Sequence, residues 1–299
     1  MTHQNISSGI TPLVFTDLDG TLLDHHTYSF EAAQPAIDFL KGAGIPWIFN
    51  TSKTLSELLP LANRLDNQHP MIVENGGGIA LPQDYPDADL SEIANSERVP
   101  GDSEHPTADG YCLVTLGAAR KLIIEVLADM RSSFAFTGAS QMSTSAFAAV
   151  TNLDEAQSGL ALERYFSEPL IWRDSEQKLS EFASALALHG LHLLRGGRFV
   201  HVIGNSDKGR AMRWLCERCW GQADNGVVTI ALGDSDNDVA MLEASDYPIV
   251  IRSPVHPPPP IKHVSVRISN HIGPAGWTEM LFGVLDELGY AVPAGKDYL

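Results

Sequence analysis

The fold prediction for this chain rests on one stretch, Phe15-Thr16-Asp17-Leu18-Asp19-Gly20-Thr21-Leu22-Leu23-Asp24. The apolar run 13–15 predicts a short buried strand, and Gly20 predicts a turn where that strand stops. Two carboxylates, Asp17 and Asp19, therefore stand at the carboxyl end of a strand, where ligands bind in open α/β sheets. Taken alone, the pair fits a metal or phosphoryl site and a solvated Asx-type turn about equally well.

Three further segments favour a functional site over a solvated turn. Residues 48–54 end an apolar strand in hydroxyls and a base, Asp207-Lys208-Gly209 opens a helical pattern, and residues 230–238 end a third apolar strand in acids. One such motif is a weak signal, but four in this order are a strong one. The ordered set (DxDGT, strand-Thr, Lys and GDxxND) resembles the haloacid dehalogenase superfamily of phosphohydrolases.

The order of the predicted elements indicates an α/β fold with an insertion. Short strand–helix–strand units in the N-terminal part predict a parallel sheet with right-handed crossovers. Lys208 follows Thr51 by 157 residues (208 − 51), which is too long for a loop of a compact domain. We therefore expect a Rossmann-like parallel-sheet core at 1–82 and 204–299, with an inserted α/β cap domain at 83–203 that carries substrate specificity.

Local signals predict where individual elements begin and end. Thr54-Leu55-Ser56-Glu57 is a capping box for a helix that Pro60 should kink or displace. Glycines 76–78 follow a strand and imply positive φ angles or a close approach of main chains. The predicted helices are 30–40, 118–130, 155–164, 175–189, 210–220 and 277–288, and the predicted strands are 45–49, 71–73, 111–116, 169–172, 191–194, 227–232, 247–251 and 264–268.

Composition narrows the class of protein and its partners. The chain has 299 residues, 44% hydrophobic and 19% charged, as in ordinary soluble proteins of one large or two modest domains. The net charge of −17 argues against nucleic acid and anionic membranes as partners. Because no apolar run approaches the ~18 residues of a membrane span and no signal peptide begins the chain, we expect a cytoplasmic protein. The oligomeric state stays unknown.

Cysteine usage points away from redox or zinc chemistry. The three cysteines are too few for a disulfide framework. Cys216 and Cys219 form a CxxC pair, but they fall within one predicted helix and no second cysteine pair accompanies them. We therefore expect these two thiols to pack in the core.

The superfamily resemblance implies a role for each matching residue. Asp17 would be the nucleophile that forms an aspartyl-phosphate, and Asp19 the general acid and later the general base. Thr51 would donate a hydrogen bond to a phosphoryl oxygen, and Lys208 would offset negative charge. A lysine in the first turn of a helix is by itself more often a solvated residue, although cations are not preferred there.

The same resemblance implies a magnesium cofactor. Asp17, Asp234 and the backbone carbonyl of Asp19 would bind the ion, and Asp238 would support that shell directly or through water. Hard oxygen ligands in small number suit Mg²⁺ better than zinc.

Finer matches resemble the mannosyl-3-phosphoglycerate phosphatases over nearly the whole chain. They are residues 50–54, 74–77, 162–169, 197–202 and 272–277, and the acidic, proline-rich segment 82–106 departs from the pattern. The implied substrate is a small phosphorylated sugar–glycerate, whose carboxylate would suit a bidentate arginine. The candidate substrate-binding residues are Ser52, Lys53, Arg164, Glu168, Arg195 and Arg198, with Arg173 as a further arginine.

Several alternatives stay open. The arginines also fit ordinary surface positions around a hairpin turn, and Glu168 fits a structural partner of Arg164 about as well. The substrate could instead be that of another capped sugar phosphatase, acting on glucosyl-3-phosphoglycerate or sucrose phosphate. A further alternative is a phosphotransferase or mutase of the same fold. The last is a non-catalytic phosphosugar-binding module, although the presence of all four motifs argues against a non-catalytic protein.

Overall fold

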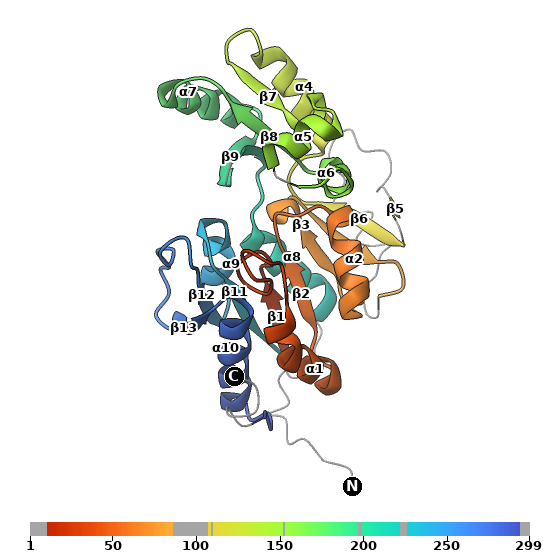
Figure 1. The fold of residues 1–299 in the computed structure, drawn as a ribbon, viewed down its shortest axis with the longest axis vertical. Coiled ribbons are helices and arrows are strands. Elements are labelled where there is room, and N and C mark those ends of the chain that lie inside the picture. The colour runs from red at the N-terminus through yellow and green to blue at the C-terminus, as the bar shows by residue number, and fades with distance from the viewer. Residues whose placement is uncertain are drawn as a thin grey trace. The chain divides into compact units, whose positions relative to one another are not determined.

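The structure is a computed structural model and describes residues 11–85, 107–108, 110–151, 153–196, 199–221 and 226–293 (Figure 1). The chain divides into two compact units, one formed by Met1–Thr51 with Lys208–Leu299 and the other by Ser52–Asp207. Both units mix helices and strands, so the α/β fold class is confirmed.

The first unit is built on five strands in the order β13-β12-β11-β1-β2, and every pairing among them is parallel. Strand β1 lies between two neighbours and is buried on both faces, as in parallel sheets that are covered by helices, and this burial explains its unbroken apolar run. The strands are β1 (Thr11–Thr16), β2 (Trp47–Asn50), β11 (Val227–Gly233), β12 (Tyr247–Arg252) and β13 (Arg267–Ile272).

Helices connect these strands, and helix α10 (Gly273–Glu287) is anchored to β1 by a hydrogen bond. Trp277 of α10 is fully buried, and its Nε1–H donates to Thr16 Oγ1 at the end of β1, 2.9 Å away. The helical segments of this unit are η1 (Glu31–Ala33), α1 (Gln34–Ala43), α8 (Lys208–Trp220), η4 (Asp236–Asp238), α9 (Val239–Ala244) and α10 (Gly273–Glu287).

The second unit contains antiparallel strands in two groups, ordered β3-β4-β6-β5 and β7-β8-β10-β9. The second group shares one apolar core with α4 and α7, which includes Leu127, Leu170, Phe182 and Val202. The strands are β3 (Met71–Val73), β4 (Gly78–Pro82), β5 (Thr107–Ala108), β6 (Tyr111–Thr115), β7 (Phe136–Gly138), β8 (Ser167–Trp172), β9 (Leu191–Gly196) and β10 (Phe199–Gly204).

The helical segments of the second unit follow the expected capping chemistry. Thr54 and Glu57 form the predicted capping box at the start of α2, which runs through Pro60 without moving its start. The segments are α2 (Leu55–Leu65), η2 (Glu74–Gly76), α4 (Arg120–Met130), η3 (Ala139–Gln141), α5 (Thr144–Thr151), α6 (Glu155–Leu162) and α7 (Glu176–Ala187). None of the helices in the described ranges is both long and apolar enough to cross a membrane.

The glycine run behaves as its sequence indicates. Gly76 has a φ of 83°, in the left-handed region that favours glycine. A Cβ atom on Gly77 or Gly78 would lie 2.7 or 2.3 Å from atoms of Phe166. The run therefore combines both expected features, a positive φ and a close approach.

Some boundaries differ from the sequence-based expectations. The strand expected at 264–268 is β13, which begins at Arg267, and Val264 is completely exposed outside it. The division into compact units assigns β3 and β4 to the second unit, whereas the expected core extended to residue 82. The boundaries 1–82 and 204–299 against 83–203 remain a proposal for the core and the inserted domain, and most of the segment 82–106 lies outside the described residues.

Candidate active site

The site begins where β1 ends, at Asp17. Its backbone N–H donates to the carbonyl of Leu232 in the neighbouring strand β11, and its side chain is almost completely buried. The chain then turns sharply, with Gly20 at a φ of 83° and its N–H bonded to the carbonyl of Leu23. A Cβ atom on Gly20 would lie 2.6 Å from Asp234 Oδ2, so only glycine fits here.

Lys208, the first residue of α8, lies between two carboxylates. Its Nζ donates to Asp17 Oδ1 at 2.7 Å and to Asp238 Oδ1 at 2.6 Å, and only 1% of the residue is exposed. Burial alone would lower the pKa of this amine, but the two carboxylates raise it above its usual value, so the ammonium form persists. Asn50, at the end of β2, donates to the Lys208 carbonyl and holds the start of the helix.

Asp234 and Asp238 follow β11 in one tight turn. Asp238 Oδ2 accepts from the backbone N–H groups of Asp234 and Ser235, each at 3.0 Å, while its Oδ1 accepts from Lys208. A Cβ atom on Gly233 would lie 2.5 Å from the Asp238 side chain, which explains the glycine before the acids. Both oxygens of Asp238 are therefore engaged in holding the turn and the lysine.

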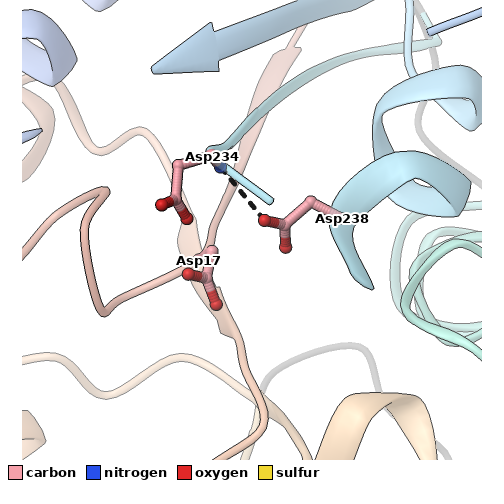
Figure 2. A group of neighbouring side chains, drawn as sticks. All are labelled: Asp17, Asp234 and Asp238. Carbon is pink, nitrogen blue, oxygen red and sulfur yellow. Dashed lines mark hydrogen bonds between the residues drawn. The ribbon is translucent and has the colours of Figure 1, made fainter. Parts of the chain in front are cut away.

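The three carboxyl groups converge on one point (Figure 2). Asp17, Asp234 and Asp238 can each offer one oxygen such that the three atoms lie within 4.8 Å of one another. Burial raises the pKa of Asp17 to about 8, with further upward contributions from Asp238 and Asp234 against the opposing effect of Lys208. Burial and Asp238 raise the pKa of Asp234 to about 6, opposed by His256 and Lys208.

This donor set fits a divalent cation. Three buried carboxylates lie together, two of them paired with Lys208 and the third beside His256. Burial, with a further contribution from the neighbouring carboxylates, raises the pKa values of Asp17 and Asp234. Carboxylate oxygens are the ligands that Mg²⁺ prefers. Asp238 is tied by two backbone N–H groups to the main chain of its own turn, whereas Asp17 is bonded to the side chain of Lys208 and Asp234 to the side chains of Thr21 and His256. Asp17 and Asp234 are therefore the carboxylates that we expect to hold the ion.

Asp19 and Thr51 lie at the same edge of the sheet. Asp19 is in the turn after β1 and forms an isolated bridge with Leu23. Thr51 directly follows β2 and is 1% exposed, and β2 pairs in parallel with β1 so that Thr16 faces Phe49. Both residues therefore belong to the loops that follow adjacent strand ends.

Sequence reasoning missed His256, which contacts the cluster. Its Nε2 lies 3.1 Å from Asp234 Oδ2, and its Nδ1 lies 3.2 Å from the carbonyl of Pro257. The only signal in the sequence is a lone histidine beside a run of prolines, which stiffens the loop after β12. No motif marks such a position.

The candidate substrate residues of the second unit are engaged in contacts within that unit. Arg164 is 9% exposed and donates to the carbonyls of Ser52 and Ala161 and to the hydroxyl of Ser167. Glu168 is fully buried and accepts from Arg120 and from the backbone of Ser140. Of the two alternatives for Glu168, these contacts favour a structural role, although its partner is Arg120 and not Arg164.

The remaining candidates lie at exposed or intermediate positions, or outside the description. Arg195 pairs with Glu176 on the surface, and Arg173 donates to Thr137 Oγ1 at 3.1 Å. Ser52 and Lys53 are half-buried and lie between Thr51 and the capping box of α2. Arg198 lies outside the described residues.

The prediction that the two cysteines of the CxxC pair pack in the core is confirmed for Cys219, whereas Cys216 is only partly buried. Cys112, Cys216 and Cys219 are free thiols, and Cys219 is buried in α8. Burial raises the pKa of both Cys216 and Cys219 to about 12, so neither is a reactive thiolate at neutral pH.

Comparisons with known proteins agree with the geometry. Residues 14–97 match a family described as haloacid dehalogenase-like hydrolase, and residues 149–257 match sucrose-6F-phosphate phosphohydrolase. A glucosyl-3-phosphoglycerate/mannosyl-3-phosphoglycerate phosphatase of Methanococcoides burtonii is 36% identical over 91% of this chain and 97% of its own. A phosphatase of the same name from Persephonella marina is 33% identical over 92% and 98%.

A solved structure shares the fold. The sucrose-phosphatase of Synechocystis, determined with sucrose and phosphate, superimposes with a TM-score of 0.57 at 13% identity and covers 94% of this chain and 99% of that one. At that identity the likeness concerns the fold alone.

Proposed function

We propose that this protein dephosphorylates a hexosyl-3-phosphoglycerate. The chain belongs to the haloacid dehalogenase-like hydrolases and is a phosphoric monoester hydrolase. The preferred substrate is mannosyl-3-phosphoglycerate, with the glucosyl compound next. The products would be mannosylglycerate, a compatible solute, and inorganic phosphate. The observation that carries the proposal is the buried cluster at the end of β1, in which Lys208 bridges Asp17 and Asp238.

In the first step Asp17 is the nucleophile. Its carboxylate oxygen attacks phosphorus, the bond from phosphorus to the glycerate oxygen breaks, and an aspartyl-phosphate forms. Asp19 gives its proton to the departing alkoxide, which leaves as an alcohol. Lys208 stays bonded to Asp17 and offsets the negative charge, and Thr51 donates a hydrogen bond to a phosphoryl oxygen.

In the second step water replaces Asp17. Asp19, now a carboxylate, accepts a proton from the attacking water, and phosphate leaves with the free Asp17 carboxylate restored. Asp238 keeps Lys208 and the turn after β11 in place through its two oxygens. Mg²⁺, held by Asp17 and Asp234 with the backbone carbonyl of Asp19, would neutralise the carboxylates and polarise the phosphoryl group.

A second candidate substrate is sucrose phosphate. The match of residues 149–257 to sucrose-6F-phosphate phosphohydrolase favours it, since this range includes residues 149–207 of the second unit. The two relatives aligned over more than nine-tenths of the chain favour the hexosyl-phosphoglycerates instead, so those remain first.

A phosphate-release screen tests the proposal. The purified protein is incubated with mannosyl-3-phosphoglycerate, glucosyl-3-phosphoglycerate, sucrose 6-phosphate and p-nitrophenyl phosphate, each with Mg²⁺ and with excess chelator. We expect Mg²⁺-dependent release that is fastest for a hexosyl-3-phosphoglycerate. Turnover that persists in chelator after dialysis contradicts the magnesium assignment, and a preference for sucrose phosphate selects the second candidate.

A further inference from the structure

Two contacts hold the main chain just after Thr51. The guanidinium Nη2 of Arg164 donates to the Ser52 carbonyl at 3.0 Å, and the backbone N–H of Glu74 donates to the Lys53 carbonyl at 3.0 Å. Both donors lie far from Ser52 in sequence, and both belong to the second compact unit. The segment between Thr51 and α2 is therefore held by residues that are distant from it in the sequence.

The two holding residues are joined to each other. Glu74 is fully buried, and its carboxylate accepts from the backbone of Tyr165 at 2.7 Å and from Ser167 Oγ at 2.6 Å. Ser167 Oγ also accepts from Arg164 Nε at 2.9 Å, and that nitrogen lies 3.4 Å from Glu74 Oε2. The result is a closed, buried ring of two hydrogen bonds and one ion pair, in which each member fixes the next.

The main chain at Glu74 is strained. Glu74 and Asn75 have φ angles of 51° and 60°, a left-handed conformation that side chains rarely adopt. Such geometry persists only where surrounding contacts over-determine it, and it collects at functional sites. Here the strain directs the Glu74 N–H to Lys53 while the side chain reaches the segment that carries Arg164.

From these contacts we infer that Glu74 and Arg164 are positioning residues of the phosphatase reaction. They fix the Ser52–Lys53 main chain, which is joined directly to Thr51, and so hold Thr51 in the conformation in which its hydroxyl meets the phosphoryl group. This inference rests on the proposed function. It gives Arg164 a role other than binding the substrate carboxylate, because the guanidinium already donates to Ser52, Ala161 and Ser167.

Two conservative variants and one matched control test the inference. Arg164→Lys keeps the charge but loses the forked contacts, and Glu74→Gln keeps the shape but loses the charge. Arg120→Lys is the control, because Arg120 forms another ion pair of this unit, with the buried Glu168, and its guanidinium donates to Glu168 and to the Leu162 carbonyl. All three should lower thermal stability, so stability alone does not decide.

The deciding readouts are kinetic values for folded protein. With p-nitrophenyl phosphate and Mg²⁺, kcat/KM of Arg164→Lys and Glu74→Gln should fall on the order of 10²-fold, because small misplacements of binding groups cost this much. Inhibition by inorganic phosphate should weaken in the same two variants. Arg120→Lys should keep the wild-type kcat, KM and inhibition constant.

Hydrogen exchange separates failure of this inference from failure of the proposed function. The backbone amides of 52–54 should exchange faster in Arg164→Lys and Glu74→Gln than in the wild type and Arg120→Lys, whether or not the protein is active. Wild-type protein without phosphatase activity would refute the proposed function and leave this exchange test in force. Unchanged exchange, or wild-type kinetic constants in both variants, would overturn the positioning role.

Discussion

The two compact units both bury charged side chains, but they balance those charges differently. In the first unit Lys208 pairs with Asp17 and Asp238 while Asp234 lies beside His256, and burial raises the pKa values of Asp17 and Asp234 to about 8 and about 6. In the second unit Glu74 and Glu168 each have an arginine partner. Buried ions cost free energy unless they are paired and hydrogen-bonded.

This difference in charge balance distinguishes the proposed reactive centre from buried ion pairs that stabilise the fold. Glu74 and Glu168 also accept backbone N–H groups, so those pairs need no further cation. The Asp17 cluster sets three carboxylates against one ammonium group, that of Lys208, which is consistent with its proposed role in binding a cation and a phosphoryl group. We therefore take the unequal number of carboxylates and cations, rather than burial of charge itself, as the mark of the proposed reactive centre.

The largest effect is expected where the nucleophile is removed. Asp17→Asn should lower phosphate release on the order of 10⁴–10⁶-fold, as loss of a catalytic nucleophile does elsewhere. Trapping of the phosphorylated enzyme with labelled substrate should fail in the same variant. Near-normal rates of phosphate release would show that the cluster of Asp17, Asp234 and Asp238 is not the reactive centre.

Removing the neighbouring acid should cost less and should depend on the leaving group. Asp19→Asn should lower turnover of a hexosyl-3-phosphoglycerate by ~10²–10⁴-fold, the usual contribution of general acid–base help. The loss should be smaller with p-nitrophenyl phosphate, because a phenolate leaves without a proton. Equal losses on both substrates would argue against an acid role for Asp19.

A moderate effect is expected from the arginines of the RGGR segment, residues 195–198. Arg198→Ala should lower kcat/KM for mannosyl-3-phosphoglycerate by about 10–150-fold, the equivalent of one lost charge-assisted hydrogen bond. The rate with p-nitrophenyl phosphate, which has no carboxylate, should hardly change. Arg195→Ala is the matched comparison, since Arg195 lies on the surface beside Glu176. Equal losses on both substrates would mean misfolding rather than lost recognition.

Much of the first unit follows from its sequence because β1, β2, β11 and β12 are short, apolar and largely buried, whereas the mostly exposed β13 was placed less well. The four motifs predicted a shared sheet edge, and β1, β2 and β11 bring Asp17, Thr51 and Asp234 to it. The capping box at Thr54 and the glycines at 76–78 were also predicted, because each reflects local backbone chemistry.

The contacts that sequence could not supply are those made between distant segments. Nothing local at Arg164 indicates that its donors go to Ser52, Ala161 and Ser167. The contact of His256 with Asp234 likewise depends on the path of a proline-rich loop. Residue type suggested that an arginine binds an anion, whereas packing decides which partner it meets.

The pH dependence of the free energy of unfolding offers a further test of the charge balance at Asp17. The pKa of Asp17 is 3.8 without the folded surroundings and about 8 within them. Between these values the folded protein holds a proton that the unfolded chain has lost, so the stability of metal-free protein falls as pH rises through that window. Asp17→Asn lacks this proton and should lose less stability between pH 5 and pH 8 than the wild type.

The most direct test of the unequal number of carboxylates and cations compares midpoints of thermal unfolding in excess chelator at pH 8. Asp17→Asn should unfold at a higher temperature than the wild type, by roughly 2–4 °C for each kcal/mol of relieved repulsion. Glu74→Gln should unfold at a lower temperature, because it breaks a balanced buried pair. Opposite signs support the account, and a decrease for Asp17→Asn as large as that for Glu74→Gln would contradict it.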